Sequence, residues 1–168
     1  MELFRSSLST PFGAMKLAVD DDGAIVELWL PNRGRVTDTR QPFPEAARRG
    51  TDLARAQLDE YLRGQRRTFE LDLNPIGTTF ERRVWTRLRD IPYGATISYG
   101  EIASEFGLAN RARAVGRANG ANPIPIIIPC HRVIGADGTL TGFGGGLPLK
   151  AALLELEGAI APPPPRLF

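Results

Sequence analysis

The sequence predicts an α+β fold, in which a small antiparallel sheet with one helix precedes a mainly helical second part. The first observation is strand-like alternation of apolar and polar residues over 15–30 and again over 68–73. The second is a run of helical spacings that starts at residue 79 and continues to the C-terminal region. A break at "NPIG" separates the two patterns. We therefore expect an N-terminal α/β domain over 1–73, a second domain over 74–160 and a proline-rich tail over 161–168.

In the first part, Met15, Leu17 and Val19 alternate with polar or small residues, and "DDDG" then provides turn chemistry before a second β-type run over 25–30. This pattern predicts a hairpin. Apolar residues at helical spacing predict a helix over 44–62, with Gly64 just beyond its end. The segment "TFELDL" (68–73) alternates again, and we expect it to return to the sheet.

In the second part, Thr79 is expected to cap a helix whose apolar stripe faces the core. Ser98 is expected to cap the next helix, with Glu101 completing a capping box and Gly107 ending it. Asn110 is expected to start a further short helix. Two helices joined by a tight turn, the second rich in arginine, are typical of a helix-turn-helix. A last helix is predicted over 149–158. The stripe of the first of these helices consists of Phe80, Val84, Trp85 and Leu88.

Composition points to an ordinary water-soluble protein of 168 residues. No apolar run approaches the roughly 20 residues that span a bilayer, and the first residues lack the pattern of a signal peptide. We therefore expect a cytoplasmic location and no membrane partner. Because the chain has one cysteine and one histidine, it can form no internal disulfide, and these two residues alone cannot complete a tetrahedral zinc site. No metal is expected.

Charge is unevenly distributed although the formal net charge is only +2. Residues 106–136 contain no acidic side chain and four arginines. A local positive field of this kind suits a polyanion such as nucleic acid, and a solvated basic face is the alternative. The four are Arg111, Arg113, Arg117 and Arg132.

Within the second short helix, Ala112, Gly116 and Gly120 recur at intervals of four, so one side of that helix is nearly bare of side chains. The functional interpretation is that the backbone approaches a narrow DNA groove while Arg113 or Arg117 projects into the duplex. The alternative is close packing of this helix against the protein's own core.

Cys130 and His131 are adjacent behind the apolar run "IPIII". Ile126 to Ile128 read as a buried strand or extended segment that ends at the cysteine. A thiol, with a free pKa of about 8.5, becomes a nucleophile when a nearby cation lowers that pKa, and His131 and Arg132 are the candidates. The alternative is an inert core cysteine. The glycine-rich stretch "GADGTLTGFGGGL" that follows can pass close to a ligand.

Two classes of electrophile are open to Cys130. An acyl carbon would require an oxyanion hole and a water for turnover, whereas a saturated alkyl carbon requires only alignment and a stabilised leaving group. Alkylation would produce a thioether, which water does not readily cleave. A protein of the second kind would act once.

The segments "NPIPIIIPCHRVIG", "SYGEIA", "RAVGRANG" and "TGFGGGLPLKAALLELEG" closely resemble the O6-alkylguanine-DNA alkyltransferases, also called methylated-DNA-protein-cysteine methyltransferases. The resemblance covers about residues 79–158. It implies a ribonuclease-H-like N-terminal domain and a single-turnover repair protein without cofactor. Cys130 would irreversibly take the alkyl group from O6-alkylguanine, less readily from O4-alkylthymine, in double-stranded DNA.

The resemblance also implies roles for individual residues. His131, held by Glu157, would activate Cys130 through water, Asn122 would hold the active-site segment, and Tyr99 would protonate the departing base. In the family a recognition helix enters the minor groove and the lesion is flipped out of the stack. Arg113 would fill the vacated stack, and the backbone groups of two further positions would hold the extruded guanine. The two positions are Val133 and Gly144.

One departure is Phe143, which occupies a position where most relatives have tyrosine, so the pocket is expected to be more apolar. Three alternatives stay open: a lesion-binding module without catalysis, a helix-turn-helix regulator, and a cysteine hydrolase. The presence of Cys130 argues against the binding module. The protein is expected to be a monomer, with cooperative assembly on DNA left open.

Overall fold

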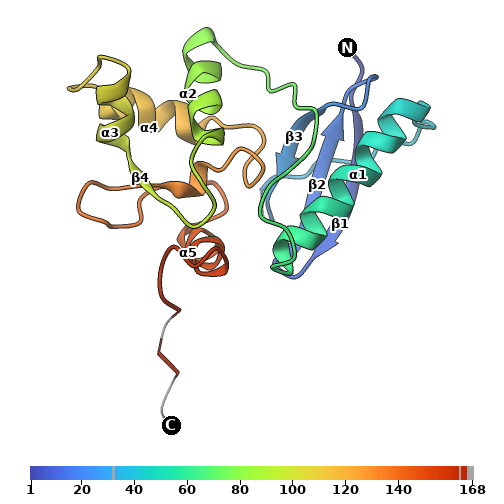
Figure 1. The fold of residues 1–168 in the computed structure, drawn as a ribbon. Helices are drawn as coiled ribbons and strands as arrows, with labels where there is room; N and C mark the ends of the chain where they lie inside the picture. The colour runs from blue at the N-terminus through green and yellow to red at the C-terminus, as the bar shows by residue number, and fades with distance from the viewer. Residues whose placement is uncertain (32, 163, 166–168) are drawn as a thin grey trace.

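The computed structural model describes residues 1–31, 33–162 and 164–165. Figure 1 shows a sheet with one long helix on one side of the molecule and a group of shorter helices on the other. The connecting segment over residues 63–78 runs between the two parts. The predicted α+β class is confirmed.

The sheet contains three antiparallel strands in the order β1 (Phe4–Thr10), β2 (Gly13–Val19) and β3 (Ile25–Trp29). The hairpin that alternation predicted is β2–β3. Strand β1, in which only Phe4 and Leu8 are buried, was not predicted. Because β1 is an edge strand with several serines, its alternation is too weak to detect.

The turn between β2 and β3 is built around Asp20 and Gly23. The Asp20 carboxylate accepts two backbone N–H groups of the turn, at 3.0 and 3.1 Å. Gly23 has φ +86°, and a Cβ there would lie 2.3 Å from the carbonyl oxygen of Ala46 in the neighbouring helix. A Cβ on Gly50 of that helix would lie 2.0 Å from the Gly23 carbonyl oxygen. Glycine at both positions therefore lets the turn contact the helix backbone directly.

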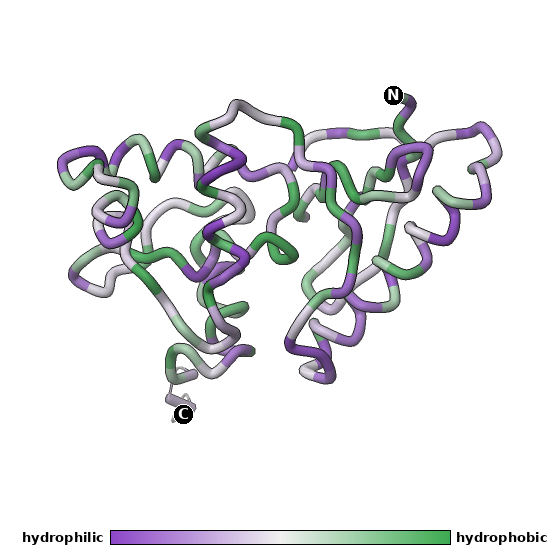
Figure 2. The backbone as a smooth tube through the Cα atoms, turned by 45° about the horizontal axis from the view of Figure 1, so that its top comes forward, coloured by the Kyte–Doolittle hydropathy of each residue, from purple (hydrophilic) through white to green (hydrophobic). Residues whose placement is uncertain are grey.

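Helix α1 (Glu45–Leu62) packs one face on this sheet. Figure 2 shows hydrophilic and hydrophobic residues alternating along it, as an amphipathic helix requires. The segment over 68–73 returns to the sheet only at Leu73, which forms a single parallel bridge with Ile25. The expectation of a strand there was therefore too extensive. The buried apolar face of α1 consists of Ala47, Ala54, Leu58, Tyr61 and Leu62.

Helix α2 (Thr79–Arg89) begins one residue earlier than predicted, because Thr78 rather than Thr79 is its N-cap. The Thr78 hydroxyl accepts the Glu81 backbone N–H at 3.1 Å, and the Glu81 carboxylate accepts the Thr78 N–H at 2.9 Å. This reciprocal pair makes the earlier threonine the better cap. Three of the four predicted stripe residues are buried, and Phe80 is partly buried against the core. The three are Val84, Trp85 and Leu88.

The short strand β4 (Ile97–Ser98) leads into helix α3 (Tyr99–Glu105). Ser98 caps α3 and forms the predicted capping box with Glu101. Gly107, at φ +70°, follows the end of α3 as predicted. Here the local signals agreed with the structure because both caps depend only on neighbouring residues.

Helix α4 (Ala112–Gly120) follows α3 after a short turn. Its N-cap is Arg111, which makes no side-chain capping bond, so the predicted start at Asn110 was wrong. The Arg111 backbone N–H instead donates to the Leu108 carbonyl at 2.7 Å, which keeps residues 108–111 in a turn. Helices α3 and α4 pack against each other.

The predicted extended segment at Ile126 to Ile128 is also wrong. Ile126 has φ +73°, which is rare for a β-branched residue, and the Ile128 N–H donates to the Ile124 carbonyl at 2.9 Å. The three isoleucines form a tight turn that buries them in the core. The chain then enters the 3-10 helix η1 (Cys130–Arg132) and strand β5 (Val133–Ile134), which pairs with β4 in parallel.

Helix α5 (Leu147–Leu156) is the last element, and Glu157 is its C-cap. The proline-rich tail predicted over 161–168 lies partly outside the described residues, since positions 163 and 166–168 are excluded. Among the described residues, no helix combines the length and the hydropathy that crossing a bilayer requires.

The two parts of the molecule share one cluster of buried apolar residues. A backbone hydrogen bond of 2.8 Å also joins them, from the Leu28 N–H in β3 to the Pro123 carbonyl near the active-site segment. The predicted division between residues 73 and 74 stays a prediction. The close packing places side chains of the first part beside Cys130.

Candidate active site

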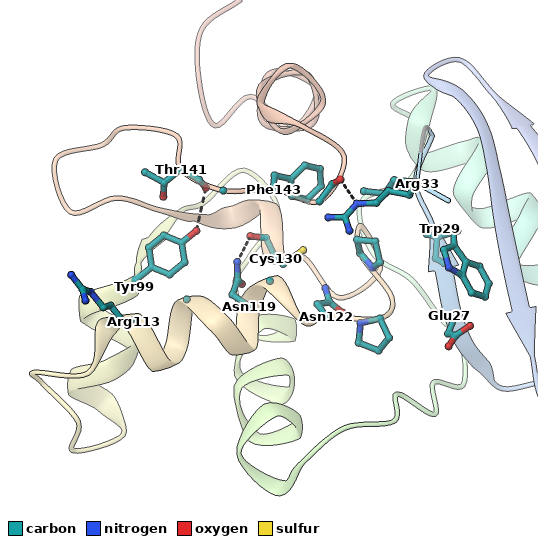
Figure 3. Close-up of a pocket in the computed structure, with 18 of the residues that line it drawn as sticks. Glu27, Trp29, Arg33, Tyr99, Arg113, Asn119, Asn122, Cys130, Thr141 and Phe143 are labelled. Atoms are coloured by element: carbon teal, nitrogen blue, oxygen red, sulfur yellow. Dashed lines mark hydrogen bonds between the residues drawn. The ribbon is translucent and has the colours of Figure 1, made fainter. Parts of the chain in front are cut away.

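Cys130 lies at the inner wall of a pocket of about 750 Å³ between the two parts of the molecule. Figure 3 shows the sulfur next to Asn122, with Tyr99 and Arg113 on one side and Trp29 and Arg33 on the other. The side chain is 5% exposed. A small nucleophile at the end of an open pocket can meet a ligand without facing bulk water.

The thiol is protonated at neutral pH in this environment. Burial raises the pKa of Cys130 to about 11, although the Asn122 amide and the Lys150 charge act in the opposite direction. Arg132, which the sequence suggested as a cation for the thiol, instead donates to Glu157 and to the Ile91 carbonyl. Cys130 therefore needs a base that removes its proton.

His131 is fully buried and its two ring nitrogens have different environments. Nε2 lies 2.8 Å from Oε2 of Glu157, whereas Nδ1 is buried without a hydrogen-bond partner among the described protein atoms. Burial lowers the pKa of His131 and outweighs the opposing effect of Glu157. The imidazole is therefore neutral at pH 7, donates from Nε2 to Glu157, and keeps Nδ1 free to accept a proton.

Glu157 is the centre of a buried network. Oε1 accepts Arg132 Nε at 2.8 Å, and Oε2 accepts Arg132 Nη2 at 2.9 Å, His131 Nε2 and the Tyr61 hydroxyl. Burial alone would raise the pKa of Glu157, but the hydrogen bonds from His131 and Arg132 outweigh it and lower the pKa to about 2. Glu157 is therefore ionised throughout the physiological range.

Asn122 joins the two ends of the isoleucine turn. Its amide Nδ2 donates to the Ile128 carbonyl at 2.8 Å, and its Oδ1 accepts the Ile124 N–H at 3.0 Å. Asn119 of α4, which sequence reasoning missed, donates to the Cys130 carbonyl at 3.3 Å. Both amides hold the backbone around the thiol, and the functional role that the resemblance implies for Asn122 stays a prediction.

Tyr99 lies on the pocket wall at the start of α3, and its hydroxyl donates to the Thr141 carbonyl at 3.3 Å. Lys150 of α5 was also missed by sequence reasoning. It is fully buried, and its Nζ donates to the carbonyls of Val133 at 2.6 Å and Thr141 at 2.8 Å. Lys150 thus ties the glycine-rich loop to the strand that follows the Cys-His-Arg sequence.

Helix α4 forms another side of the pocket. Ala112, Arg113, Gly116 and Gly120 line it, and Arg113 is exposed, whereas Arg117 is exposed without lining it. A Cβ on Gly120 would meet no atom within 4 Å. At Gly116 it would meet only the Tyr99 ring, at 3.8 Å, an ordinary contact. The alternative of close packing against the core is therefore wrong for both glycines.

The glycine-rich loop supplies Phe143 and Gly144 to the pocket wall, while Val133 is buried and does not line it. The Gly144 carbonyl accepts a hydrogen bond from Nε of Arg33, in the segment after β3. Arg33 was missed because no local pattern marks a side chain that contacts a loop more than 100 residues away. Trp29, which also lines the pocket, was missed too. Among the described residues, no cluster of three or more histidine, cysteine or acidic side chains could hold a metal ion.

Comparisons with known proteins agree with this arrangement. Residues 79–159 match the family model described as 6-O-methylguanine DNA methyltransferase, DNA binding domain. The methylated-DNA–protein-cysteine methyltransferase of Mycobacterium tuberculosis is 57% identical over 112 residues, which cover 67% of this chain and 68% of the relative. The protein of the same name from Methanosarcina acetivorans is 40% identical over 163 residues, covering 94% of this chain and 99% of the relative.

Solved structures give the same result. The crystal structure of M. tuberculosis O6-methylguanine methyltransferase has a TM-score of 0.81 and 43% identity, with 96% of each chain covered. That of M. tuberculosis OGT in complex with DNA has a TM-score of 0.79 and 44% identity, with 93% of each chain covered. This chain therefore belongs to the methylated-DNA–protein-cysteine methyltransferase family.

Proposed function

We propose that this protein repairs DNA by transferring the alkyl group of O6-alkylguanine, and less readily of O4-alkylthymine, irreversibly to Cys130. The observation that carries this proposal is the position of the chain's only cysteine at the inner wall of a pocket, followed in the chain by a neutral His131 that is hydrogen-bonded to ionised Glu157. The relatives are named for transfer from methylated DNA to a protein cysteine, and one solved neighbour is a complex with DNA.

The proposed reaction begins with loss of the thiol proton to Nδ1 of His131, directly or through a water. Glu157 remains ionised and stabilises the imidazolium that forms. The sulfur then attacks the alkyl carbon, the carbon–O6 bond breaks, and its electron pair passes to the guanine. The Tyr99 hydroxyl donates a proton to the departing base. His131 then releases the thiol proton to solvent, and solvent reprotonates Tyr99. Overall, the alkyl group ends on sulfur and the thiol proton on guanine.

The reaction is expected to occur once per protein molecule, because the product is a thioether with no leaving group for water to displace. The resting thiol, with its pKa raised to about 11, is a poor nucleophile until its proton is taken. Reactivity is thus restricted to a base that has entered the pocket and aligned its alkyl carbon with the sulfur.

Double-stranded DNA is the proposed partner, engaged by α3 and α4 as a helix-turn-helix. The open surfaces at Gly116 and Gly120 support close approach of the α4 backbone to the minor groove. Because the pocket is recessed, the alkylated nucleotide would have to leave the base stack to reach it, and Arg113, which lines the pocket, would occupy the gap. We expect the protein to act as a monomer and leave cooperative assembly on DNA to measurement.

The direct test is intact-protein mass spectrometry after incubation with a duplex that contains one O6-methylguanine. We expect a gain of one methyl group per protein molecule, located on Cys130 by peptide mapping and lost in Cys130→Ser. Binding of the duplex without a mass gain would favour a lesion-binding module. Restoration of many lesions per protein molecule would favour a hydrolase.

A further inference from the structure

The acceptor that orients His131 is shared with a side chain from the first part of the molecule. Tyr61, in the last turn of α1, donates its hydroxyl proton to Oε2 of Glu157, the same oxygen that lies 2.8 Å from His131 Nε2. The Tyr61 oxygen is also 3.5 Å from that nitrogen. The three polar groups are therefore in mutual contact although they come from α1, η1 and the end of α5.

We infer that Tyr61 is a positioning residue for alkyl transfer, which fixes the Glu157 oxygen that orients His131 and limits how strongly Glu157 attracts the His131 proton. This inference rests on the proposed function, because it assigns Tyr61 a role through His131 and not through contact with DNA. It also makes α1, which does not line the pocket that contains Cys130, part of the reaction machinery.

Packing fixes the Tyr61 hydroxyl in this position. Tyr61 is fully buried, and its ring contacts Phe69 at 5.2 Å and Tyr93 edge-on at 6.1 Å between ring centroids. A buried phenol requires a hydrogen-bond acceptor, and Glu157 supplies it. Burial and the adjacent Glu157 charge both raise the pKa of Tyr61, so the phenol remains a donor at every physiological pH.

The electrostatic consequence follows from the sharing of one oxygen. Each donor on Oε2 withdraws electron density that would otherwise stabilise a proton on His131. Tyr61 therefore helps to keep His131 neutral and able to accept the thiol proton. Among the described residues, the other charged or titratable groups that act on this centre are Arg132 from η1, Lys150 from α5, and Tyr93, whose ring lies 5.8 Å from the Arg132 guanidinium carbon and 5.3 Å from that of Arg67.

The test substitutes Tyr61→Phe, which removes the hydroxyl and keeps the ring. Tyr93→Phe is the matched control, because the Tyr93 hydroxyl donates to the Leu156 carbonyl at 3.2 Å, one residue before Glu157, without contacting the carboxylate. Both variants lose one buried or partly buried phenol hydrogen bond beside the end of α5. Only Tyr61→Phe changes the donors on Glu157.

Two readouts distinguish positioning from a structural role. His131 is the chain's only histidine, so its imidazole signals in an NMR pH titration belong to one residue. We expect Tyr61→Phe to raise the pKa of His131 and to shift the acid limb of the alkyl-transfer rate to higher pH. At pH 6 the transfer should be roughly three- to tenfold slower than in wild type, with a smaller difference at pH 8. Tyr93→Phe should change neither the acid limb of the alkyl-transfer rate nor the pKa of His131.

An unchanged pH profile in folded Tyr61→Phe, or the same change in both variants, would overturn the inference. If Tyr61→Phe does not fold, 3-fluorotyrosine can be incorporated in a Tyr93→Phe/Tyr99→Phe background, where Tyr61 is the remaining tyrosine. The more acidic phenol is a stronger donor, so the His131 pKa must fall, and no fall would refute the role. The proposed function fails separately, if wild type gains no alkyl group at Cys130.

Discussion

At the residue scale, the central feature is a histidine kept neutral beside an ionised carboxylate. Such a pair more often produces an ion pair, but Arg132 already neutralises Glu157 through two hydrogen bonds, and burial of His131 disfavours its charged form. A neutral imidazole whose Nε2 is committed to Glu157 is a base only at Nδ1. In the proposed reaction, the residue that follows the nucleophile in sequence would therefore accept the thiol proton at the ring edge opposite Glu157.

The neutral state of His131 predicts how stability depends on pH. The folded-state pKa lies below the unfolded value of about 6.5, so the unfolded chain binds more protons as the pH falls below 6.5. Stability is therefore complete above pH 6.5 and decreases on acidification, by at most about 1.4 kcal/mol per pH unit. The lowered pKa of Glu157 also reduces stability on acidification, but only below about pH 4.5. The change in stability between pH 6.5 and 5.5 therefore reports on His131.

Urea unfolding of wild type and His131→Gln at intervals between pH 7.5 and 5.5 would measure this effect. Wild type should lose stability below pH 6.5, while the variant, which has no histidine, should remain nearly constant. A wild type that becomes more stable on acidification would show instead that imidazolium–Glu157 pairing dominates. In that case a larger fraction of His131 would be protonated at neutral pH and unable to accept the thiol proton.

At the element scale, helix α4 combines an open glycine face with exposed arginines at its two ends. A Cβ at Gly116 or Gly120 would be crowded by no atom of the described residues, so the helix propensity lost at Gly116, about 0.5–1 kcal/mol, is not offset by close packing there. A cost without an internal benefit is expected where an external partner must approach closely. The same helix places Arg113, but not Arg117, at the pocket.

This difference predicts distinct behaviour for two variants that each lose one positive charge. Arg113→Ala should slow repair of an O6-methylguanine duplex by roughly tenfold or more, because extrusion of the nucleotide costs a few kcal/mol that the side chain offsets. Its reaction with free O6-methylguanine or O6-benzylguanine should change little. Arg117→Ala should weaken duplex binding and its salt dependence modestly, without selective loss of repair.

Single-turnover rates on duplex and free base, with Kd values at several salt concentrations, would separate the two effects. Equal losses of Arg113→Ala on duplex and free base would contradict an extrusion role. If the two arginine variants showed the same repair rate and the same Kd on the duplex, both side chains would contribute only general electrostatic attraction to DNA.

The elements that the sequence predicted well are those with local determinants. The Ser98–Glu101 capping box, the turn at Asp20 and the amphipathic α1 depend on residues within a few positions of one another. The isoleucine turn at Ile126 could not be predicted, because tertiary burial stabilises a backbone conformation that isoleucine disfavours on its own. Strand β1 was missed because its serines conceal its two buried positions.

At the scale of the whole molecule, some residues of the site could be predicted from the sequence and others could not. Cys130 and His131 were singled out from the residues themselves, Glu157 through a resemblance, and the structure brings His131 and Glu157 into hydrogen-bond contact. Tyr61 and Arg33 were not identified, because their partners depend on how the two parts pack together. Lys150 was not identified, because its contacts with Val133 and Thr141 depend on how α5 packs on the loop before it, and no spacing in the sequence encodes either arrangement. The first part of the chain therefore contributes to the site through long-range contacts alone.

If the two parts are united by a common core, they should unfold together. The chain has two tryptophans, Trp29 in β3 and buried Trp85 in α2, so each part carries its own reporter. With 5-fluorotryptophan incorporated, the two ¹⁹F resonances should lose their native intensity at the same urea midpoint, since the buried apolar cluster, the Leu28–Pro123 hydrogen bond and the Tyr61–Glu157 contact all join the parts.

Two separated midpoints would contradict this coupling and would support independent domains over 1–73 and 74–160. The order of loss would then be informative. If the Trp29 resonance disappears first while the His131 titration is unchanged, the first part is not required to hold the catalytic network. If the His131 pKa moves as soon as the Trp29 resonance is lost, the network depends on the docking of α1, because undocking removes the Tyr61 hydroxyl from Glu157.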